Sequence, residues 1–530
     1  MTERRGKART AVVIGAGFSG LATAALLARD GVDVTVLEAH ESVGGRAGEW
    51  HQQGFRFETG PSWYLMPEVF DRFFEEMGTT TADELELIRL DPAYRVFFEE
   101  QSQPFDLPDQ DSLGALQEWE QTPGSLTAYM RSAEETCRLA TDRLLYSPYD
   151  SPRDFADPGL LRRLPRLLRL LFEPMDRFIS RHTSDPQVQK ILGYPAVFLG
   201  TSPKAAPSLY HLMSHLDVNQ SVLYPRGGFS AVVAAIARLA RQHGVDLRTG
   251  HRVTEVITEG TNAAGVRFTT PEGEHNSLAA DIVVSSADIH HTDTALLAPR
   301  FRSRSTASWE RRNPGPGAVL ALLGVEGELP ELAHHSLFFT EDWQRGFEEI
   351  EGRLPAQGPP RSLYVCRPSA TDDEVAPAEH ENLFILIPVR ADPDTGAGGI
   401  DGSGSPSVER FVDEAIDQIA SWADVPDLSS RVTVRRSVGP ADFEREFGAW
   451  RGGALGPAHT LRQSAFLRGP IRSSKLDGLY YAGSTTMPGI GVPMCLISAE
   501  LVRTSVRRGP RRSLLRRFRH RPATQGARRA

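Results

Sequence analysis

An apolar strand that runs directly into three spaced glycines opens this chain, and few folds begin in that way. Residues 11–14 read Ala-Val-Val-Ile, and Gly15, Gly17 and Gly20 follow at once. Alanine and leucine then recur at helical spacing, and residues 34–37, Val-Thr-Val-Leu, have the length and composition of a second strand. Strand, glycine turn, helix and strand in this order predict the βαβ unit of a dinucleotide-binding fold.

Each of the three glycines has its own task in such a turn. Gly15 allows the tight turn, Gly17 lets the backbone approach a pyrophosphate, and Gly20 lets the helix pack closely on the strand. The free N–H groups at the start of the helix add an anion site. Glu38 ends the second strand, where a carboxylate can accept hydrogen bonds from ribose hydroxyls. The cofactor is therefore FAD or NAD.

A second glycine turn and a distant closing segment favour FAD. Gly44-Gly45-Arg46 follows Glu38 closely, as a pyrophosphate-wrapping turn would. Near the other end, residues 478–482 predict a strand, and the glycine-rich residues 483–491 lead into a helix predicted over about residues 493–503. Backbone groups at that helix start can hold flavin oxygens. An NAD domain needs no such second segment.

With 530 residues, the chain is too long for one compact core. Because the nucleotide-binding segments lie far apart, we expect a discontinuous cofactor domain with inserted substrate segments. The expected cofactor domain comprises residues 8–70, 222–295 and 431–505. The expected domain for substrate and membrane binding comprises residues 71–221 and 296–430, and residues 506–530 are expected to form a basic tail without fixed structure.

Cysteine usage and apolar runs bear on the compartment. The three cysteines, Cys137, Cys366 and Cys495, make no disulfide framework and no Cys/His ligand spacing, so we expect a reducing compartment and no metal site. The histidines at 290 and 291 lack ligand companions and are expected to be surface or packing residues. The longest unbroken apolar run, residues 231–237, is too short to cross a bilayer. The sequence predicts a cytoplasmic protein.

The charge is unevenly distributed. Of the 59 basic side chains, 11 follow Glu500 and all are arginines, so residues 1–502 hold 48 basic against 68 acidic side chains. A basic tail on an acidic body can bind anionic lipid or nucleic acid, or can simply be solvated. We expect a lipid surface and no nucleic acid.

Taken together, residues 10–503 resemble the bacterial phytoene desaturases, members of a superfamily that includes the amine oxidases. Four segments carry the resemblance: the opening βαβ unit with Gly44-Gly45-Arg46, then Phe57-Glu58-Thr59-Gly60-Pro61-Ser62, then Tyr224-Pro225-Arg226-Gly227-Gly228, and finally residues 483–500. The last two are the specific ones. The resemblance implies an α/β fold, with a glutathione-reductase-like FAD-binding domain of Rossmann type and an inserted α+β domain.

The resemblance also assigns residues to FAD. Those that would hold its ADP half are Gly15, Gly17, Gly20, Glu38, Gly44, Gly45 and Arg46, with Val253 meeting the adenine through its backbone. Those that would lie along the flavin are Gly60, Pro61, Gly483, Gly491, Val492 and Pro493.

The implied reaction removes a hydride and a proton from neighbouring carbons of a polyene, with the flavin accepting the hydride. A polyene delocalises developing positive charge, so a strong protein base is not required. Glu58 is a candidate base, but it can equally cap backbone N–H groups. Arg226 is a candidate for neutralising reduced flavin, and it can equally be a structural arginine.

A hydrocarbon substrate requires contact with the bilayer. Residues 160–172 interleave leucine and arginine, which favours an interfacial helix, with two short pieces expected on either side of Pro165. The alternative is a pair of core helices with arginines outward. We therefore expect peripheral binding to the inner face of the cell membrane, and a quinone or oxygen as electron acceptor.

The expected activity is conversion of phytoene toward lycopene in carotenoid biosynthesis. Three alternatives stay open: desaturation of a shorter or hydroxylated carotenoid, a carotene isomerase, and a non-enzymatic prenyl-binding protein on the same fold. Residues 488–498 argue against an amine oxidase or a protoporphyrinogen oxidase.

Overall fold

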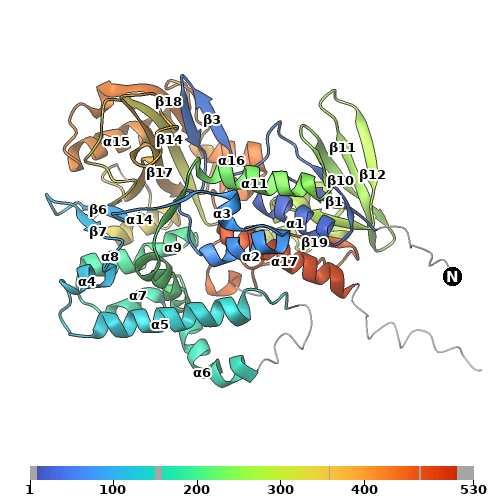
Figure 1. The fold of residues 1–530 in the computed structure, drawn as a ribbon, viewed down its shortest axis with the longest axis horizontal. Helices are drawn as coiled ribbons and strands as arrows, with labels where there is room; N and C mark the ends of the chain where they lie inside the picture. The colour runs from blue at the N-terminus through green and yellow to red at the C-terminus, as the bar shows by residue number, and fades with distance from the viewer. Residues whose placement is uncertain (1–8, 150–157, 357, 465–466, 510–530) are drawn as a thin grey trace, which may run out of the picture.

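A parallel sheet of five strands gathers the cofactor segments from all over the chain (Figure 1). The computed structural model describes residues 9–149, 158–356, 358–464 and 467–509. The strands lie in the order β19, β13, β1, β2, β9, and every neighbouring pair is parallel. Their bounds are β1 Thr10–Ile14, β2 Asp33–Leu37, β9 Asp246–Arg248, β13 Ile282–Ser285 and β19 Leu479–Tyr481. The predicted βαβ opening and the predicted closing strand are confirmed, and they share one sheet.

Four helices and an antiparallel sheet surround this parallel sheet (Figure 1). The helices are α1 Phe18–Arg29, α2 Pro67–Met77, α11 Gly228–Gln242 and α17 Val492–Arg508, and the antiparallel strands are β10 Arg252–Glu259, β11 Asn262–Thr269 and β12 His275–Ala279. Helix α17 runs beyond the predicted end near residue 503. Arg503 pairs with Asp30 and Glu76, and Arg507 also pairs with Asp30. Arg503 and Arg507, which belong to the 11 arginines after Glu500, therefore form ion pairs that hold α17 against the cofactor part.

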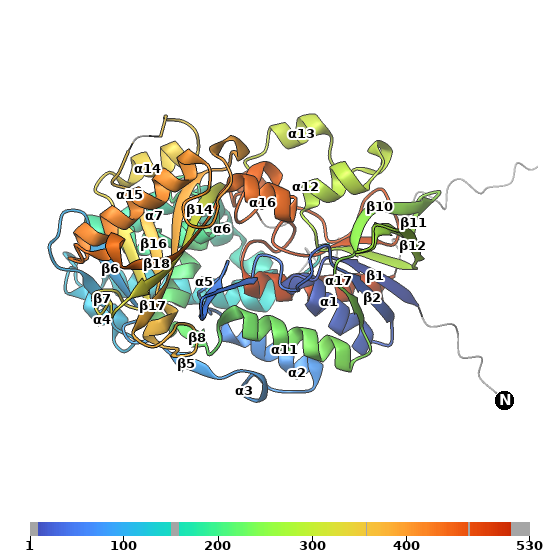
Figure 2. The ribbon, with the colours of Figure 1, turned by 90° about the horizontal axis from the view of Figure 1, so that it is seen from above.

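A seven-stranded mixed sheet forms the second part of the molecule (Figure 2). Its order is β18, β14, β17, β16, β15, β6, β7, with bounds β6 Tyr94–Phe98, β7 Phe105–Leu107, β14 Pro316–Glu326, β15 His335–Phe339, β16 Leu363–Cys366, β17 His380–Arg390 and β18 Val432–Val438. Along β14, Val319 and Leu323 pack toward α15 (Pro406–Trp422), and Leu320 and Leu322 pack toward the helical part. Both faces are covered, which explains the unbroken apolar sequence of this strand.

The expected boundaries between the two parts need correction. Strand β18 pairs with β14, so the cofactor part does not resume at residue 431. The second half of α2 packs into the cofactor core through Phe73 and Phe74, beyond the expected boundary at residue 70. Phe301 and Trp309 pack with strands of the parallel sheet, beyond the boundary at residue 295. Sequence alone misplaced these boundaries because pairing and packing partners far along the chain decide them.

Short elements fill residues 71–221 and the connections. The helices are α3 Thr81–Glu84, α4 Ser112–Gln117, α5 Ser125–Leu139, α6 Pro158–Phe172, α7 Met175–Ser180, α8 Pro186–Gly193, α9 Pro195–Phe198, α10 Leu212–Ser214, α12 Ile289–His291, α13 Thr306–Glu310, α14 Trp343–Ile350 and α16 Pro440–Phe447. The remaining strands form two ribbons, β3 Glu49–Gln52 with β4 Phe55–Glu58, and β5 Leu87–Arg89 with β8 Leu223–Pro225. None of the described helices is both long enough and apolar enough to span a bilayer.

Helix α6 is continuous, which corrects the expected break at Pro165. An interior proline costs about 3 kcal/mol, so contacts outside the helix must offset that cost. Leu170 is buried under the helix, and Arg166 hydrogen-bonds to Glu135, Ser132 and Thr136 of α5. Tertiary contacts therefore override the local signal. Most of the basic tail, residues 510–530, lies outside the described residues.

Candidate functional site

A cavity of about 930 Å³ extends from the edge of the parallel sheet into the helical part. Nearly all of the residues predicted for FAD line it: Gly15, Gly17, Glu38, Gly44, Gly45, Arg46, Gly60, Pro61, Val253, Gly483, Gly491, Val492 and Pro493. Gly20 does not line it. A Cβ on Gly20 would lie 2.0 Å from the Gly15 carbonyl oxygen, so this glycine serves the close packing of α1 against the first turn. One surface thus brings together segments from both ends of the chain.

The two glycine turns are joined to each other. Gly15 and Gly44 have φ values of +92° and +112°, which residues with a side chain rarely adopt. The Gly44 N–H donates to the Ala16 carbonyl oxygen at 2.9 Å. At Gly17 the nearest protein atom to an added Cβ is 3.9 Å away, so the protein itself does not require glycine there. The open space beside Gly17 is consistent with a pyrophosphate at this position.

Glu38 is buried and holds the first turn in place. One carboxylate oxygen accepts a hydrogen bond from the Ala16 N–H at 2.6 Å, and the other accepts one from the His40 N–H at 2.9 Å. The side chain also lines the cavity, at the end of β2. Glu38 is therefore positioned for a ribose, and the turn depends on it as well.

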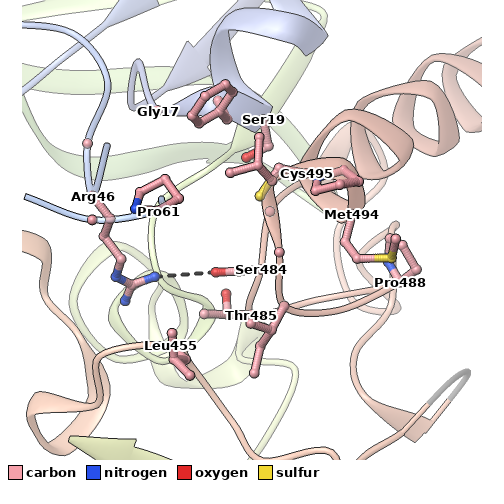
Figure 3. Close-up of a pocket in the computed structure, with 18 of the residues that line it drawn as sticks. Gly17, Ser19, Arg46, Pro61, Leu455, Ser484, Thr485, Pro488, Met494 and Cys495 are labelled. Atoms are coloured by element: carbon pink, nitrogen blue, oxygen red, sulfur yellow. Dashed lines mark hydrogen bonds between the residues drawn. The ribbon is translucent and has the colours of Figure 1, made fainter. Parts of the chain in front are cut away.

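Arg46 places a partly buried positive charge beside the turns. Its guanidinium donates to Ser484 Oγ at 3.3 Å, while its Nε is buried without a hydrogen-bond partner (Figure 3). Burial lowers the pKa of Arg46 from its ordinary value. A cation with a buried, unused donor favours an anionic ligand.

Two helices begin at this cavity. Gly17 is the residue before α1, and Gly491, with φ +118°, is the residue before α17. The first N–H groups of a helix lack partners within the helix, and they attract phosphate or carbonyl oxygens. The two helix starts, the open space at Gly17 and the unused Arg46 donor together fit FAD, which these residues would hold.

The two catalytic candidates lie outside this cavity. Glu58 accepts hydrogen bonds from the Ser230 N–H at 2.7 Å and from Ser230 Oγ at 3.0 Å, so it caps the start of α11. Burial raises the pKa of Glu58 to about 7. Arg226 forms an ion pair with Glu86 at 3.0 Å on the surface. Neither contributes to the cavity lining, so the structural interpretation holds for both.

Residues that no motif indicated also shape the site. The Ile490 N–H donates to His459 Nε2 at 3.2 Å, so His459 Nδ1 carries the proton and donates to Tyr210 Oη at 2.6 Å. Arg468 is fully buried and donates to the carbonyl oxygens of Ser484 and Pro457. His459 and Arg468 hold the closing segment in place. They lie in irregular sequence without periodicity, so no sequence signal could have revealed them.

The histidines and cysteines behave differently from what their spacing indicated. His290 packs between the rings of Trp309 and Trp450, as predicted, whereas His291 lines the cavity. His334, His335 and Cys366, which no ligand spacing connects, come together in a buried cluster that could hold a metal ion. Spacing along the sequence gave no sign of this cluster, because the fold brings the three residues together.

The other end of the cavity is apolar. Its lining includes Leu144, Leu164, Leu167, Leu168, Leu171, Phe198, Leu209, Leu212, Met213, Leu216, Leu320, Phe384 and Leu386. Four of these belong to α6, on which Leu164, Leu168 and Phe172 are 44%, 44% and 66% exposed, and Phe172 does not line the cavity. Helix α6 thus contributes apolar side chains both to the cavity and to the protein surface.

Comparison with known proteins also indicates a flavoprotein, and the matches cover nearly the whole chain. Residues 18–502 match the family of flavin-containing amine oxidoreductases. A carotenoid 3,4-desaturase of Haloarcula japonica is 38% identical over 92% of this chain and 96% of its own. A zeta-carotene-forming phytoene desaturase of Myxococcus xanthus is 32% identical over 93% of each chain.

Solved structures show the same fold at low sequence identity. An oxidoreductase from Methanosarcina mazei has a TM-score of 0.60 at 16% identity, over 94% of this chain and all of its own. Cyclohexylamine oxidase from Brevibacterium oxydans has a TM-score of 0.56 at 14% identity, over 94% of this chain and all of its own. The family match and the cavity lining together mean that the enzyme is an FAD-dependent oxidoreductase. The chain belongs to the carotenoid desaturase family, within the superfamily of flavin-containing amine oxidoreductases.

Proposed function

We propose that the enzyme removes two hydrogens from a saturated carbon–carbon unit of a long linear carotenoid. The observation that carries this proposal is the double character of one cavity, with glycine turns and helix starts at one end and leucine and aromatic side chains at the other. A polyene offers no hydrogen-bonding groups, so an apolar lining is what binds it and excludes water. Bound FAD supplies the hydride acceptor.

Neither His459 nor Glu58 is available as a base. Both ring nitrogens of His459 are engaged, and Glu58 caps α11 outside the cavity. Burial also holds the pKa of His459 well below its usual range, which keeps the ring neutral. The role of the lining is therefore to orient the polyene substrate and to keep water away. The conjugated substrate itself delocalises the developing positive charge.

The preferred substrate of the proposal is phytoene, desaturated toward lycopene in carotenoid biosynthesis. The relative from Myxococcus xanthus supports this choice. A second candidate is 3,4-desaturation of an already conjugated carotenoid, which the higher identity to the Haloarcula japonica relative favours, at 38% against 32%. The two candidates differ in whether phytoene or lycopene is consumed.

One assay separates these candidates. Purified enzyme loaded with FAD is given liposomes that contain phytoene or lycopene, with a quinone under anaerobic conditions or with oxygen alone. We expect phytoene to be consumed and longer chromophores to form, with one acceptor reduced for each double bond. Consumption of lycopene alone would select the 3,4-desaturase. Isomerisation without acceptor reduction would select an isomerase, and carotenoid binding without conversion would select a carrier.

We further propose that α6 docks the enzyme on the inner face of the cell membrane, from the cytoplasm. Amphipathic helices with leucine or phenylalanine on one face and arginine on the other lie in the interface of a bilayer. Leu164 and Leu168 line the cavity and are also exposed, so substrate could pass from lipid to cavity along apolar side chains. Arg162 and Arg163 are exposed on the same helix and suit anionic headgroups.

A further inference from the structure

Three metal-ligating side chains meet at strands β15 and β16, beside Trp63 of the cavity lining. They are His334, His335 and Cys366, all buried, and one nitrogen of each ring and the cysteine sulfur lie within 4.8 Å of one another. His335 on β15 is the direct cross-strand partner of Cys366 on β16. Strand pairing therefore holds two of the three side chains in fixed register.

Hydroxyl groups orient both imidazole rings. Thr371 Oγ1 lies 2.7 Å from His334 Nδ1, and Tyr364 Oη lies 2.8 Å from His335 Nδ1. The Nε2 atoms of both histidines are buried and have no hydrogen-bond partner. This pattern is typical of metal-binding histidines, in which a hydrogen bond to one nitrogen fixes the ring and leaves the other nitrogen for the metal.

Packing explains only part of this arrangement. The ring of His335 stacks on Trp63 with centroids 4.3 Å apart and planes 8° apart, so the ring also has a role in the core. An apolar ring would stack as well, without the cost of a buried, unpaired nitrogen. Two such nitrogens beside a buried thiol need a further explanation.

We propose that His334, His335 and Cys366 bind a thiophilic metal ion with a filled d shell, Cu(I) or Zn(II). Imidazole and thiolate ligands suit these ions, and the absence of carboxylate from the set disfavours Mg²⁺ and Ca²⁺. On binding, the metal–sulfur bond replaces the S–H bond of Cys366 and one proton leaves to solvent, with no change of oxidation state. The thiolate neutralises Cu(I) fully and Zn(II) by half.

The metal would stabilise a wall of the cavity. Trp63 lines the cavity and stacks on His335, and Tyr364 lines the cavity and contacts the same ring. Cross-linking β15, β16 and the segment before β15 would fix these two aromatic side chains. This inference concerns the fold and does not depend on which carotenoid is desaturated.

The test measures metal and FAD separately in the purified, FAD-loaded enzyme. The protein is incubated with Zn(II), or anaerobically with Cu(I), then desalted and analysed for metal by mass spectrometry and for FAD by absorbance. We expect about one ion per chain. Cys366→Ala should lose the metal and keep FAD, and Thr371→Val, which removes the partner of His334, should weaken binding by about 10–100-fold.

Cys137→Ala is the matched control, because Cys137 is also a buried thiol but belongs to no cluster of three metal-ligating side chains among the described residues. It should keep the metal. The proposal fails if the wild type retains no more metal than Cys366→Ala. If Cys366→Ala does not fold, Co(II) added to the wild type decides, since the d–d bands of four-coordinate, thiolate-ligated cobalt lie at longer wavelengths than flavin absorption. Absence of those bands would overturn the proposal.

Discussion

At the residue scale, Gly17 tests whether the cavity binds the cofactor where the glycine turns indicate. An added Cβ there meets no protein atom closer than 3.9 Å, so Gly17→Val should fold. Its side chain would fill the space beside the α1 start, where the pyrophosphate must approach. We expect loss of flavin absorbance in the purified variant, with the far-ultraviolet circular dichroism unchanged.

The matched control is Gly346→Val in α14, where an added Cβ also meets nothing within 4 Å. This variant should retain FAD. Equal flavin content in both variants would mean that the dinucleotide binds elsewhere.

Glu58 should make the stability of the protein depend on pH. Burial raises its pKa to about 7 in the folded protein, from 4.5 in the unfolded chain. Between these values the folded state holds a proton that the unfolded state has lost, so stability falls as pH rises through this window. Glu58→Gln should remove this slope and stabilise the protein at pH 8 by about 1–3 kcal/mol.

Denaturant melts of both proteins across this pH range test the expectation. Because Glu58 lies outside the cavity, desaturation by Glu58→Gln should stay within about twofold of the wild type, in contrast to the 10²–10⁴-fold that a general base contributes. A drop of that larger size would restore Glu58 as the base.

At the element scale, α6 carries the membrane proposal. Phe172 is 66% exposed on this helix and does not line the cavity, so it can be changed without touching the substrate path. Burying a phenylalanine in lipid contributes about 1.5–3 kcal/mol, or roughly tenfold to a hundredfold in partitioning. Phe172→Glu should therefore weaken liposome binding by about that factor in flotation assays, with FAD content unchanged.

Ile400→Glu serves as the control, since Ile400 is 46% exposed but lies in a loop before α15. We expect it to float with liposomes like the wild type. If both variants lose binding equally, α6 has no special role in docking.

At the scale of the whole molecule, the basic C-terminal tail should assist recruitment without inserting. Each basic residue near an anionic surface contributes at most about 1 kcal/mol, and salt screens the effect. Deleting the residues after Arg508 should weaken binding to anionic liposomes, most visibly at low salt. FAD content should not change, because α17 and its ion pairs from Arg503 and Arg507 remain.

If the truncated protein binds liposomes as well as the full chain does, the tail does not contribute to recruitment. In that case α6 alone would account for recruitment, and the Phe172 variant would show the larger loss.

The local signals of this chain were enough to predict the glycine turns and the first and last strands of its cofactor part. Gly15, Gly44 and Gly491 adopt positive φ values that short-range sterics reserve for glycine, so their meaning does not depend on distant residues. The apolar strands β1 and β19, and the helix starts that follow the glycines, can likewise be predicted from neighbouring residues alone. Backbone geometry of this kind is determined by a few neighbouring residues.

Other features depend on residues that are far apart in the sequence, and only the tertiary structure decided them. Glu58 caps α11 across 172 residues, and β18 joins β14 instead of the cofactor sheet. Cross-strand pairing brings His335 to Cys366, although their spacing indicates no ligand set. Burial and partner choice arise from long-range packing, which propensity and spacing do not encode.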